Sequence, residues 1–311
     1  MSNRWSVTSE MKRVHLTQVF SGGACNIMNE NAILVRNTER DRINDWITEQ
    51  KILFFDPQIH PDTHGVDYDY ALHHPLELGA RTAARVNLYE ISPYTFGGIT
   101  SLEIAIDHLR RREPTVIYYS DGEPDRDNLP PHSKDGYPLF RPRGINHNPH
   151  ARFAHYREFR KVGRLMRRFM IDLAHELDTL TVTFGDDDAR KGDVLISPYR
   201  LHAVDMFKAA IKAADGERVF VNFAGGDNMR DEKGLPLFVL PEEPNETRLD
   251  TLLDQYVDEG CELRKAIAEL VEIGVYLRVV YTQRSAIVAL DEMFKAKSIK
   301  PYPNVLTKEG N

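Results

Sequence analysis

The sequence lacks most features that mark secreted, zinc-stabilised or membrane-spanning proteins. Its two cysteines, Cys25 and Cys261, lie far apart and match no zinc-binding spacing, which indicates reduced thiols rather than a disulfide framework or a metal site. No apolar run approaches the ~18 residues that a membrane-spanning helix needs. The opening segment, MSNRWSVTSEMKRVHL, has no apolar stretch like that of a secretory signal. We therefore expect a soluble, cytoplasmic protein without a membrane partner.

An excess of positive charge is also absent. The 40 Lys and Arg residues are outnumbered by 47 Asp and Glu residues, which gives a formal net charge of −7. This balance argues against a general nucleic-acid-binding protein, although it does not exclude a local basic patch. At 311 residues, 41% of them hydrophobic, the chain is long enough to bury a sizeable core in one large or two ordinary domains.

Short apolar runs alternate with amphipathic segments along the first third of the chain. Strands are expected at 14–20, 51–55, 85–92 and 114–120, and helices around 43–47 and at 75–84 and 99–112. Strands and helices that alternate with short connections are typical of a parallel sheet with helices on both faces. Residues 13–122 are thus predicted to form a three-layer α/β domain of the Rossmann or flavodoxin-like kind.

The rest of the chain has a different pattern. Residues 123–150, rich in Pro, Asp, Gly, His and Asn, are predicted to be a loop or linker. Residues 151–311 are predicted to form a second domain, α/β at first and helical later, to which the sequence assigns no role. Its expected helices are 151–178, 200–214 and 246–297, the last capped by Asn245, and its expected strands are 179–184, 218–223 and 235–240.

Small and polar residues follow the first two predicted strands. Ser21, Gly22 and Gly23 are expected to form a turn that brings backbone N–H groups close to a ligand. Asp56 ends the second strand at the edge where α/β sheets bind ligands. It either contacts the ligand or forms an ordinary Asp-Pro turn.

The most informative stretch follows the third predicted strand. Gly97 and Gly98 are expected to form a turn, and Glu103 is expected in the first turns of the helix after it. A helix start favours a negative charge, and an ionised carboxylate beside a sugar can attack its anomeric carbon to form a glycosyl-enzyme intermediate. The ordinary alternative is a solvated first-turn glutamate that complements the helix dipole.

Four segments resemble the nucleoside 2-deoxyribosyltransferase family and its hydrolytic relatives, the nucleotide N-glycosidases, and they stand in the family's order. They are residues 19–26 (VFSGGACN), 54–57 (FFDP), 76–91 and 97–105 (GGITSLEIA), within a span of about 14–120. The resemblance implies that Glu103 is the nucleophile. It implies that Glu77, 26 residues earlier (103 − 77), orients the ribose or helps to protonate the leaving base. It also implies a homo-oligomer that needs neither cofactor nor metal.

The catalytic stretch departs from the family in one respect. Family members that use deoxynucleosides often carry an acid in this loop, whereas residues 92–98 (SPYTFGG) contain none. This absence favours hydrolysis over base exchange. A hydroxyl of Thr100 or Ser101 would then bind a phosphate or sugar, which favours a nucleotide substrate. Tyr70 is expected to stack on the base, together with Tyr68 and His74.

Two further clusters leave alternatives open. The loop residues His60, His64 and Asp67 superficially resemble a metal site, but loose clusters of this kind are usually only polar, and no metal is expected. The basic stretch 157–168 is expected to be the wet face of a core helix, with a phosphate- or nucleic-acid-binding face as the alternative.

The sequence therefore predicts cleavage of the N-glycosidic bond of a nucleoside or nucleotide, by hydrolysis or base exchange. The competing hypothesis is a nucleotide-sensing module that binds without turnover and signals through the C-terminal half. A structural interaction protein is the third interpretation.

Overall fold

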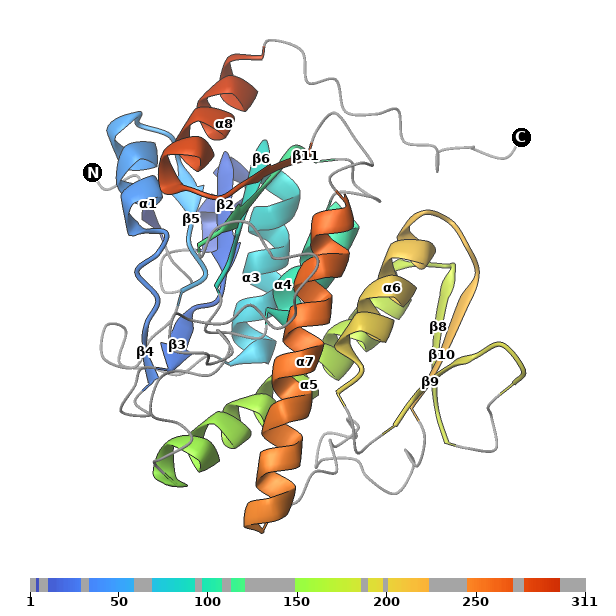
Figure 1. Ribbon diagram of the computed structural model, residues 1–311. Coiled ribbons are helices and arrows are strands. Elements are labelled where there is room, and N and C mark those ends of the chain that lie inside the picture. Colours follow the sequence, from blue (N-terminus) through green and yellow to red (C-terminus); the bar gives the residue numbers. More distant parts are fainter. Residues whose placement is uncertain are drawn as a thin grey trace, which may run out of the picture.

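The chain has an α/β fold, as the sequence predicts (Figure 1). The computed structural model describes residues 4–5, 11–28, 34–58, 69–92, 97–107, 113–120, 149–185, 190–197, 201–223, 245–270 and 277–296. Among the described helices, none combines the length and the apolar character that would let it cross a membrane.

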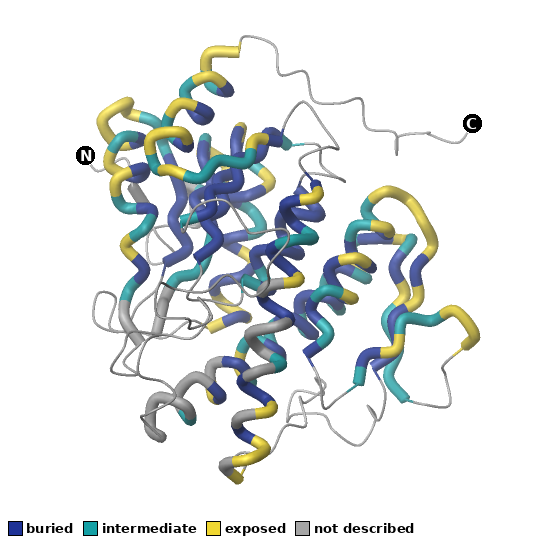
Figure 2. Tube along the Cα trace, in the orientation of Figure 1, coloured by how far each residue is buried: buried dark blue, intermediate teal, exposed yellow. Residues whose placement is uncertain are grey.

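The main sheet is parallel and has six strands in the order β1-β5-β2-β6-β7-β11. They are β1 (Arg4–Trp5), β2 (Val19–Gly23), β5 (Phe54–Phe55), β6 (Val86–Ile91), β7 (Thr115–Tyr119) and β11 (Leu277–Val280). Without the edge strand β1, chain order runs 2-1-3-4-5 across the sheet, which is the flavodoxin-like order. All of β6 and β7 is buried, because helices cover both faces (Figure 2).

Each face of this sheet has its own helices. On one face, α1 (Asp41–Glu49) packs beside α8 (Gln283–Lys295) over an apolar cluster that includes Ile43, Ile47 and Leu290. On the other face, α3 (Tyr70–Ala83) and α4 (Gly98–Ala105) contribute Leu76, Ala80 and Leu102 to a larger cluster. The chain therefore leaves β2 toward one face and β6 toward the other.

A large unit lies in the chain between β7 and β11. Its elements are α5 (Pro149–Glu176), β8 (Leu180–Phe184), β9 (Val194–Ile196), α6 (Ala203–Ala214), β10 (Val219–Phe223) and α7 (Glu246–Glu269). The three strands form a second parallel sheet in the order β8-β10-β9. Helix α4 packs against α5, α6 and α7, so the unit shares one apolar core with the main sheet (Figure 1).

The structure differs from the sequence predictions at the end of the chain. Residues 277–296 were expected in the C-terminal half, as part of a helix over 246–297, but β11 pairs with β7 in the main sheet and α8 covers that sheet. The apolar run Leu277–Val280 fits either a helix or a buried strand by periodicity. Only the pairing of this segment with the distant strand β7 makes it a strand, and a local sequence pattern does not specify that pairing.

Smaller differences occur in the first half. Met11–Leu16 forms a 3₁₀ helix, so the first strand of the predicted series begins at Val19 rather than residue 14. Helix α3 begins at Tyr70, five residues before the predicted Pro75, because the Asp69 side chain caps its first turn. A short antiparallel pair, β3 (Asn26–Met28) and β4 (Leu34–Arg36), was not predicted, nor was β9. The predicted strand 235–240 lies outside the described residues.

Candidate active site

The switch point of the main sheet lies between β2 and β6. Open α/β sheets bind ligands where neighbouring strands send the chain to opposite faces, at their carboxyl ends. Gly23 of β2 and Glu90 of β6 are paired in register at this point. The predicted site residues lie around it, but the sheet divides them into two groups on opposite faces.

Ser21, Gly22 and Gly23 are the last residues of β2, so the predicted glycine turn is wrong. A Cβ atom at Gly22 would lie 2.7 Å from ring carbons of Phe20 and Tyr89. Gly23 has a φ of +132°, and a Cβ atom there would lie 2.6 Å from the Glu90 carbonyl oxygen. Both glycines are thus required by close packing at the switch point.

On the α1 face, Ser21 and Asp56 belong to one hydrogen-bonded cluster. Ser21 Oγ donates to Asn44 Oδ1 (2.8 Å), and Asn44 Nδ2 donates to Asp56 Oδ2 (3.2 Å). The Arg40 guanidinium lies 3.6 Å from Asp56 Oδ1, and the Gln58 backbone N–H donates to the same oxygen (3.0 Å). Ser21 and Asp56 are completely buried. Their polar groups therefore join β2, α1 and the end of β5.

Glu90 completes this cluster and was missed by the sequence analysis. Its carboxylate accepts hydrogen bonds from Asn37 Nδ2 and Ser120 Oγ, each at 2.8 Å. Burial raises the pKa of Glu90 to about 7, against the lowering effects of Arg40 and of these two donors. The available signal was an acidic residue near the carboxyl end of a predicted buried strand.

On the opposite face, Glu103 lies in the second turn of α4 and is only 6% exposed. It is not the solvated first-turn glutamate of the ordinary alternative. Arg81 Nη1 of α3 donates to Glu103 Oε1 (3.1 Å). The same guanidinium donates twice to Asp107, from Nε (3.0 Å) and from Nη2 (2.7 Å). One arginine thus bridges two carboxylates four residues apart, Glu103 in α4 and Asp107 just beyond the end of that helix.

The Arg81–Asp107 pair is supported by the strand beneath it. Tyr89 Oη donates to Asp107, and Asn87 Nδ2 donates to Asp107 Oδ2 (3.1 Å). Burial acts to lower the pKa of Arg81, but the charges of Asp107 and Glu103 outweigh it and raise this pKa well above its ordinary value. Arg81 therefore stays charged. The sequence analysis missed Arg81 and Asp107, although each lies four residues after a predicted catalytic glutamate.

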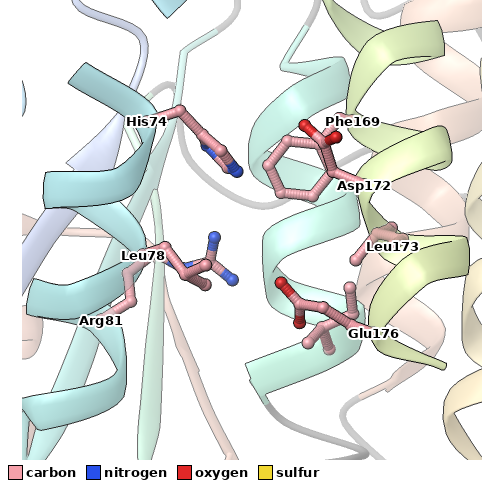
Figure 3. A pocket seen from close by; sticks show the side chains of 8 residues that line it. His74, Leu78, Arg81, Phe169, Asp172, Leu173 and Glu176 are labelled. Carbon is pink, nitrogen blue, oxygen red and sulfur yellow. The ribbon is translucent and has the colours of Figure 1, made fainter. Parts of the chain in front are cut away.

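Glu77 lies on α3 one turn before Arg81 and is 7% exposed. The helical spacing places Glu77 on the same side of α3 as Arg81, toward α4. A crevice nearby, between α3 and α5, is lined by His74, Leu78, Arg81, Ile106, Phe169, Asp172, Leu173 and Glu176 (Figure 3). Its volume of about 10 Å³ holds roughly one water molecule. A nucleoside does not fit this crevice, and neither Glu77 nor Glu103 lines it.

Tyr70 is placed at the start of α3 and bound to α5. Its ring stacks on His74 (centroids 4.5 Å apart), and the Arg168 guanidinium lies 4.4 Å from its ring centroid. Its hydroxyl donates to Asp172. Burial and the Asp172 hydrogen bond raise the pKa of Tyr70, so the hydroxyl stays protonated. Stacking of Tyr70 on a base stays a prediction; the described contacts are to protein groups.

The loop before α4 is held by its own backbone. Gly97 is left-handed (φ +66°) and precedes the helix, and the Ser101 N–H donates to its carbonyl oxygen (2.9 Å). Ser101 Oγ donates to the Gly98 carbonyl oxygen (2.6 Å) and is completely buried, while Thr100 is 6% exposed. The Ser101 hydroxyl is therefore used within the helix. A phosphate contact by Thr100 stays a prediction.

Within the described part of the chain, no three His, Cys, Asp or Glu side chains are grouped to hold a metal ion. The loop that contains His60, His64 and Tyr68 lies outside the described residues. Comparisons with protein-family models, with curated proteins and with solved structures found no match.

Proposed function

We propose that this chain cleaves the N-glycosidic bond of a nucleoside or nucleotide, with Glu103 as the attacking carboxylate. The observation that carries the proposal is the pairing of Arg81, on α3, with Glu103, on α4, the helix that directly follows the switch-point strand β6. Arg81 supplies a permanent positive charge beside the carboxylate, and attack on an anomeric carbon requires a charged nucleophile. The resemblance to the nucleoside 2-deoxyribosyltransferases assigns the same glutamate.

The proposed reaction has two steps. A Glu103 carboxylate oxygen bonds to C1′ of the sugar, and the C1′–N bond breaks with its electron pair passing to the base nitrogen. Glu77, in its protonated form, supplies a proton to that nitrogen. Water then attacks C1′ of the glycosyl-enzyme, gives a proton to the Glu77 carboxylate and releases the Glu103 carboxylate. A second base in place of water gives exchange. The absence of an acid in the loop before α4 favours water.

Asp107 acts in this scheme as a positioning residue. It accepts two of the hydrogen bonds of Arg81 and so fixes the orientation in which Nη1 meets Glu103. Tyr89 and Asn87 in turn hold Asp107. The nucleophile is thus oriented by a chain of buried groups that begins on β6.

The test is release of free base by Glu103→Gln, which keeps the shape of the side chain and removes its charge. Wild-type protein is expected to release base from at least one member of a panel of nucleosides and nucleotides, measured by chromatography. Glu103→Gln is expected to release none while its circular dichroism is unchanged. The control is Glu217→Gln, an exposed site after α6, which is expected to turn over normally. Equal release by Glu103→Gln and wild type would refute the proposal.

The competing function, a nucleotide sensor without turnover, is favoured by one observation. Helix α4 packs directly on α5, α6 and α7, and Tyr119 Oη of β7 donates to the Arg264 carbonyl oxygen of α7 (3.0 Å). A ligand at the switch point would therefore act on the inserted unit. The same panel separates the two functions: a sensor gains thermal stability with a nucleotide but yields no product.

A further inference from the structure

Helix α5 carries a groove lined by cationic side chains. The lining residues are Arg157, Arg160, Lys161, Arg164 and Leu165, and the groove volume is about 320 Å³. The opposite side of α5 holds Tyr156, Phe159, Met166 and Phe169 in the apolar core. This helix, the long green element of Figure 1, is therefore amphipathic. One side packs into the core, and the groove on the other side is lined by charges of one sign, all positive.

Among the residues that the structure describes, no acidic side chain is paired with the cations of the groove, Arg157, Arg160, Lys161 and Arg164. Arg157 and Lys161 are four residues apart, as are Arg160 and Arg164, so like charges face each other along the helix. Such pairs destabilise a helix, whereas a wet face usually alternates charges of opposite sign. Arg160 Nε is also buried without a hydrogen-bond partner. A solvated surface alone does not account for this arrangement.

The cationic side chains form a stripe that continues toward the main sheet. Arg157, Lys161, Arg164 and Arg168 follow one another at helical spacing, and the guanidinium of Arg168 lies over the ring of Tyr70. Tyr70 begins α3, which starts at the carboxyl edge of the main sheet. From Arg157 to Arg168 the stripe spans eleven residue steps (168 − 157), about 16 Å at the α-helical rise of about 1.5 Å per residue.

The length of the stripe selects among anionic ligands. The cations that line the groove span seven residue steps (164 − 157), about 10 Å along the helix axis. One strand of a duplex presents a phosphate about every 3.4 Å along its axis, so the groove faces about three successive phosphates. A single phosphate would leave most of the cations unpaired. The net charge of −7 describes the whole chain and does not weaken a cation cluster within a screening length of about 8–10 Å.

We propose that the groove on α5 binds the phosphodiester backbone of a nucleic acid. Recognition is by charge and is independent of base sequence, because the described lining contains only cationic groups and Leu165. The proposal does not rest on N-glycosidic cleavage, since it concerns a different face of the molecule and predicts binding rather than turnover. It takes up the alternative that the sequence left open for the basic stretch 157–168, against the expectation from net charge that a nucleic-acid partner is unlikely.

The test is fluorescence anisotropy of the full-length protein with labelled oligonucleotides of about 20 nucleotides, one single-stranded oligo-dT and one duplex, at about 50–200 mM NaCl. Wild-type affinity for one or both is expected to fall with salt. About three neutralised phosphates give a slope of log K against log salt of about −2 for the single strand and about −3 for the duplex. The ratio of the two affinities identifies the preferred form.

Two charge-matched variants locate the site. Arg157→Glu/Arg164→Glu reverses two groove charges, and Lys208→Glu/Lys212→Glu reverses two exposed charges on α6. The groove variant is expected to bind at least about 10-fold more weakly and to lose about half of the salt slope, whereas the α6 variant changes affinity less than about 2-fold. Both variants are first checked by thermal melting, and Arg164→Gln replaces the double variant if that unfolds.

Three outcomes would overturn the proposal. They are no binding of either oligonucleotide at low salt, equal weakening by both variants, and binding only to phosphatidylserine vesicles or to pyrophosphate. Glu103→Gln is expected to bind oligonucleotides like wild type. If Glu103→Gln loses base release but still binds oligonucleotides, and the groove variant loses oligonucleotide binding but still releases base, the two activities belong to separate sites. Each proposal can then fail without the other.

Discussion

Glu103 and Glu90, buried on opposite faces of the main sheet, are held by different kinds of partner. On the α4 side, Glu103 and Asp107 share the guanidinium of Arg81, which is itself completely buried among them. On the α1 side, Glu90 accepts its hydrogen bonds from the neutral groups of Asn37 and Ser120, and its pKa is raised to about 7. Burial raises the pKa of Glu90 more than its two hydrogen-bond donors and the nearby Arg40 lower it, so this carboxyl group lies near the balance between its two forms.

The largest expected effect comes from removing the cation on the α4 side. Arg81→Met leaves Asp107 and Glu103 buried without a positive partner, and is expected to lower the free energy of unfolding by about 3–5 kcal/mol. Urea denaturation measures this change. Arg284→Met, at an exposed site on α8, serves as the control and is expected to change stability by less than about 0.5 kcal/mol. Similar losses in the two variants would mean that the Arg81 cluster is not held by charge.

An intermediate effect is expected on the α1 side, and it depends on pH. The pKa of Glu90 is raised from 4.5 to about 7, so the folded state holds a proton that the unfolded state releases between these values. Its contribution to stability is complete below pH 4.5 and is lost as the pH rises through 7.

Glu90→Gln imitates the protonated form and removes this loss. Relative to the variant, wild type is expected to lose about 1–3 kcal/mol of unfolding free energy between pH 5 and pH 8, measured by urea denaturation at each pH. Glu217→Gln, which is exposed, should show a constant difference from wild type over the same range. A constant difference for Glu90→Gln as well would show that Glu90 does not change its charge in this window.

The smallest effects compare single donors on the two faces. Tyr89→Phe removes a hydrogen bond to the charged Asp107 and is expected to cost about 1.5–3 kcal/mol at pH 7. Ser120→Ala removes a hydrogen bond to Glu90 and is expected to cost about 1 kcal/mol. Both are measured by thermal and urea denaturation. A larger loss of unfolding free energy in Ser120→Ala than in Tyr89→Phe would contradict the view that Asp107 is charged and that Glu90 is only partly charged at pH 7.

Local sequence pattern predicted the elements whose identity is decided locally. β6 and β7 are short apolar runs between turn residues, α5 and α6 follow the helical period, and Asn245 caps α7 through a hydrogen bond from the Arg248 N–H. Glu103 was correctly placed on the helix after β6, and its role as nucleophile stays a prediction.

Features that depend on distant pairing could not be predicted. The Arg81 bridge joins side chains on two helices, and nothing in either segment alone specifies its partner. A turn was predicted at Ser21–Gly23 because glycine usually marks a turn. In the structure the two glycines instead allow β2 and β6 to approach closely. β11 resembled its helical neighbours until its parallel pairing with β7 was known.

The insertion between β7 and β11 also sets the order in which the main sheet can be completed. β11 begins 158 residues after the end of β7 (277 − 119), so the edge of β7 has no partner from β11 until that length has been synthesised. At ribosomal rates of about 5–20 residues per second, the wait is about 8–30 s. The nascent chain must protect an apolar edge for that time. A message truncated after α7 would yield a sheet that permanently lacks its last strand and the cover of α8.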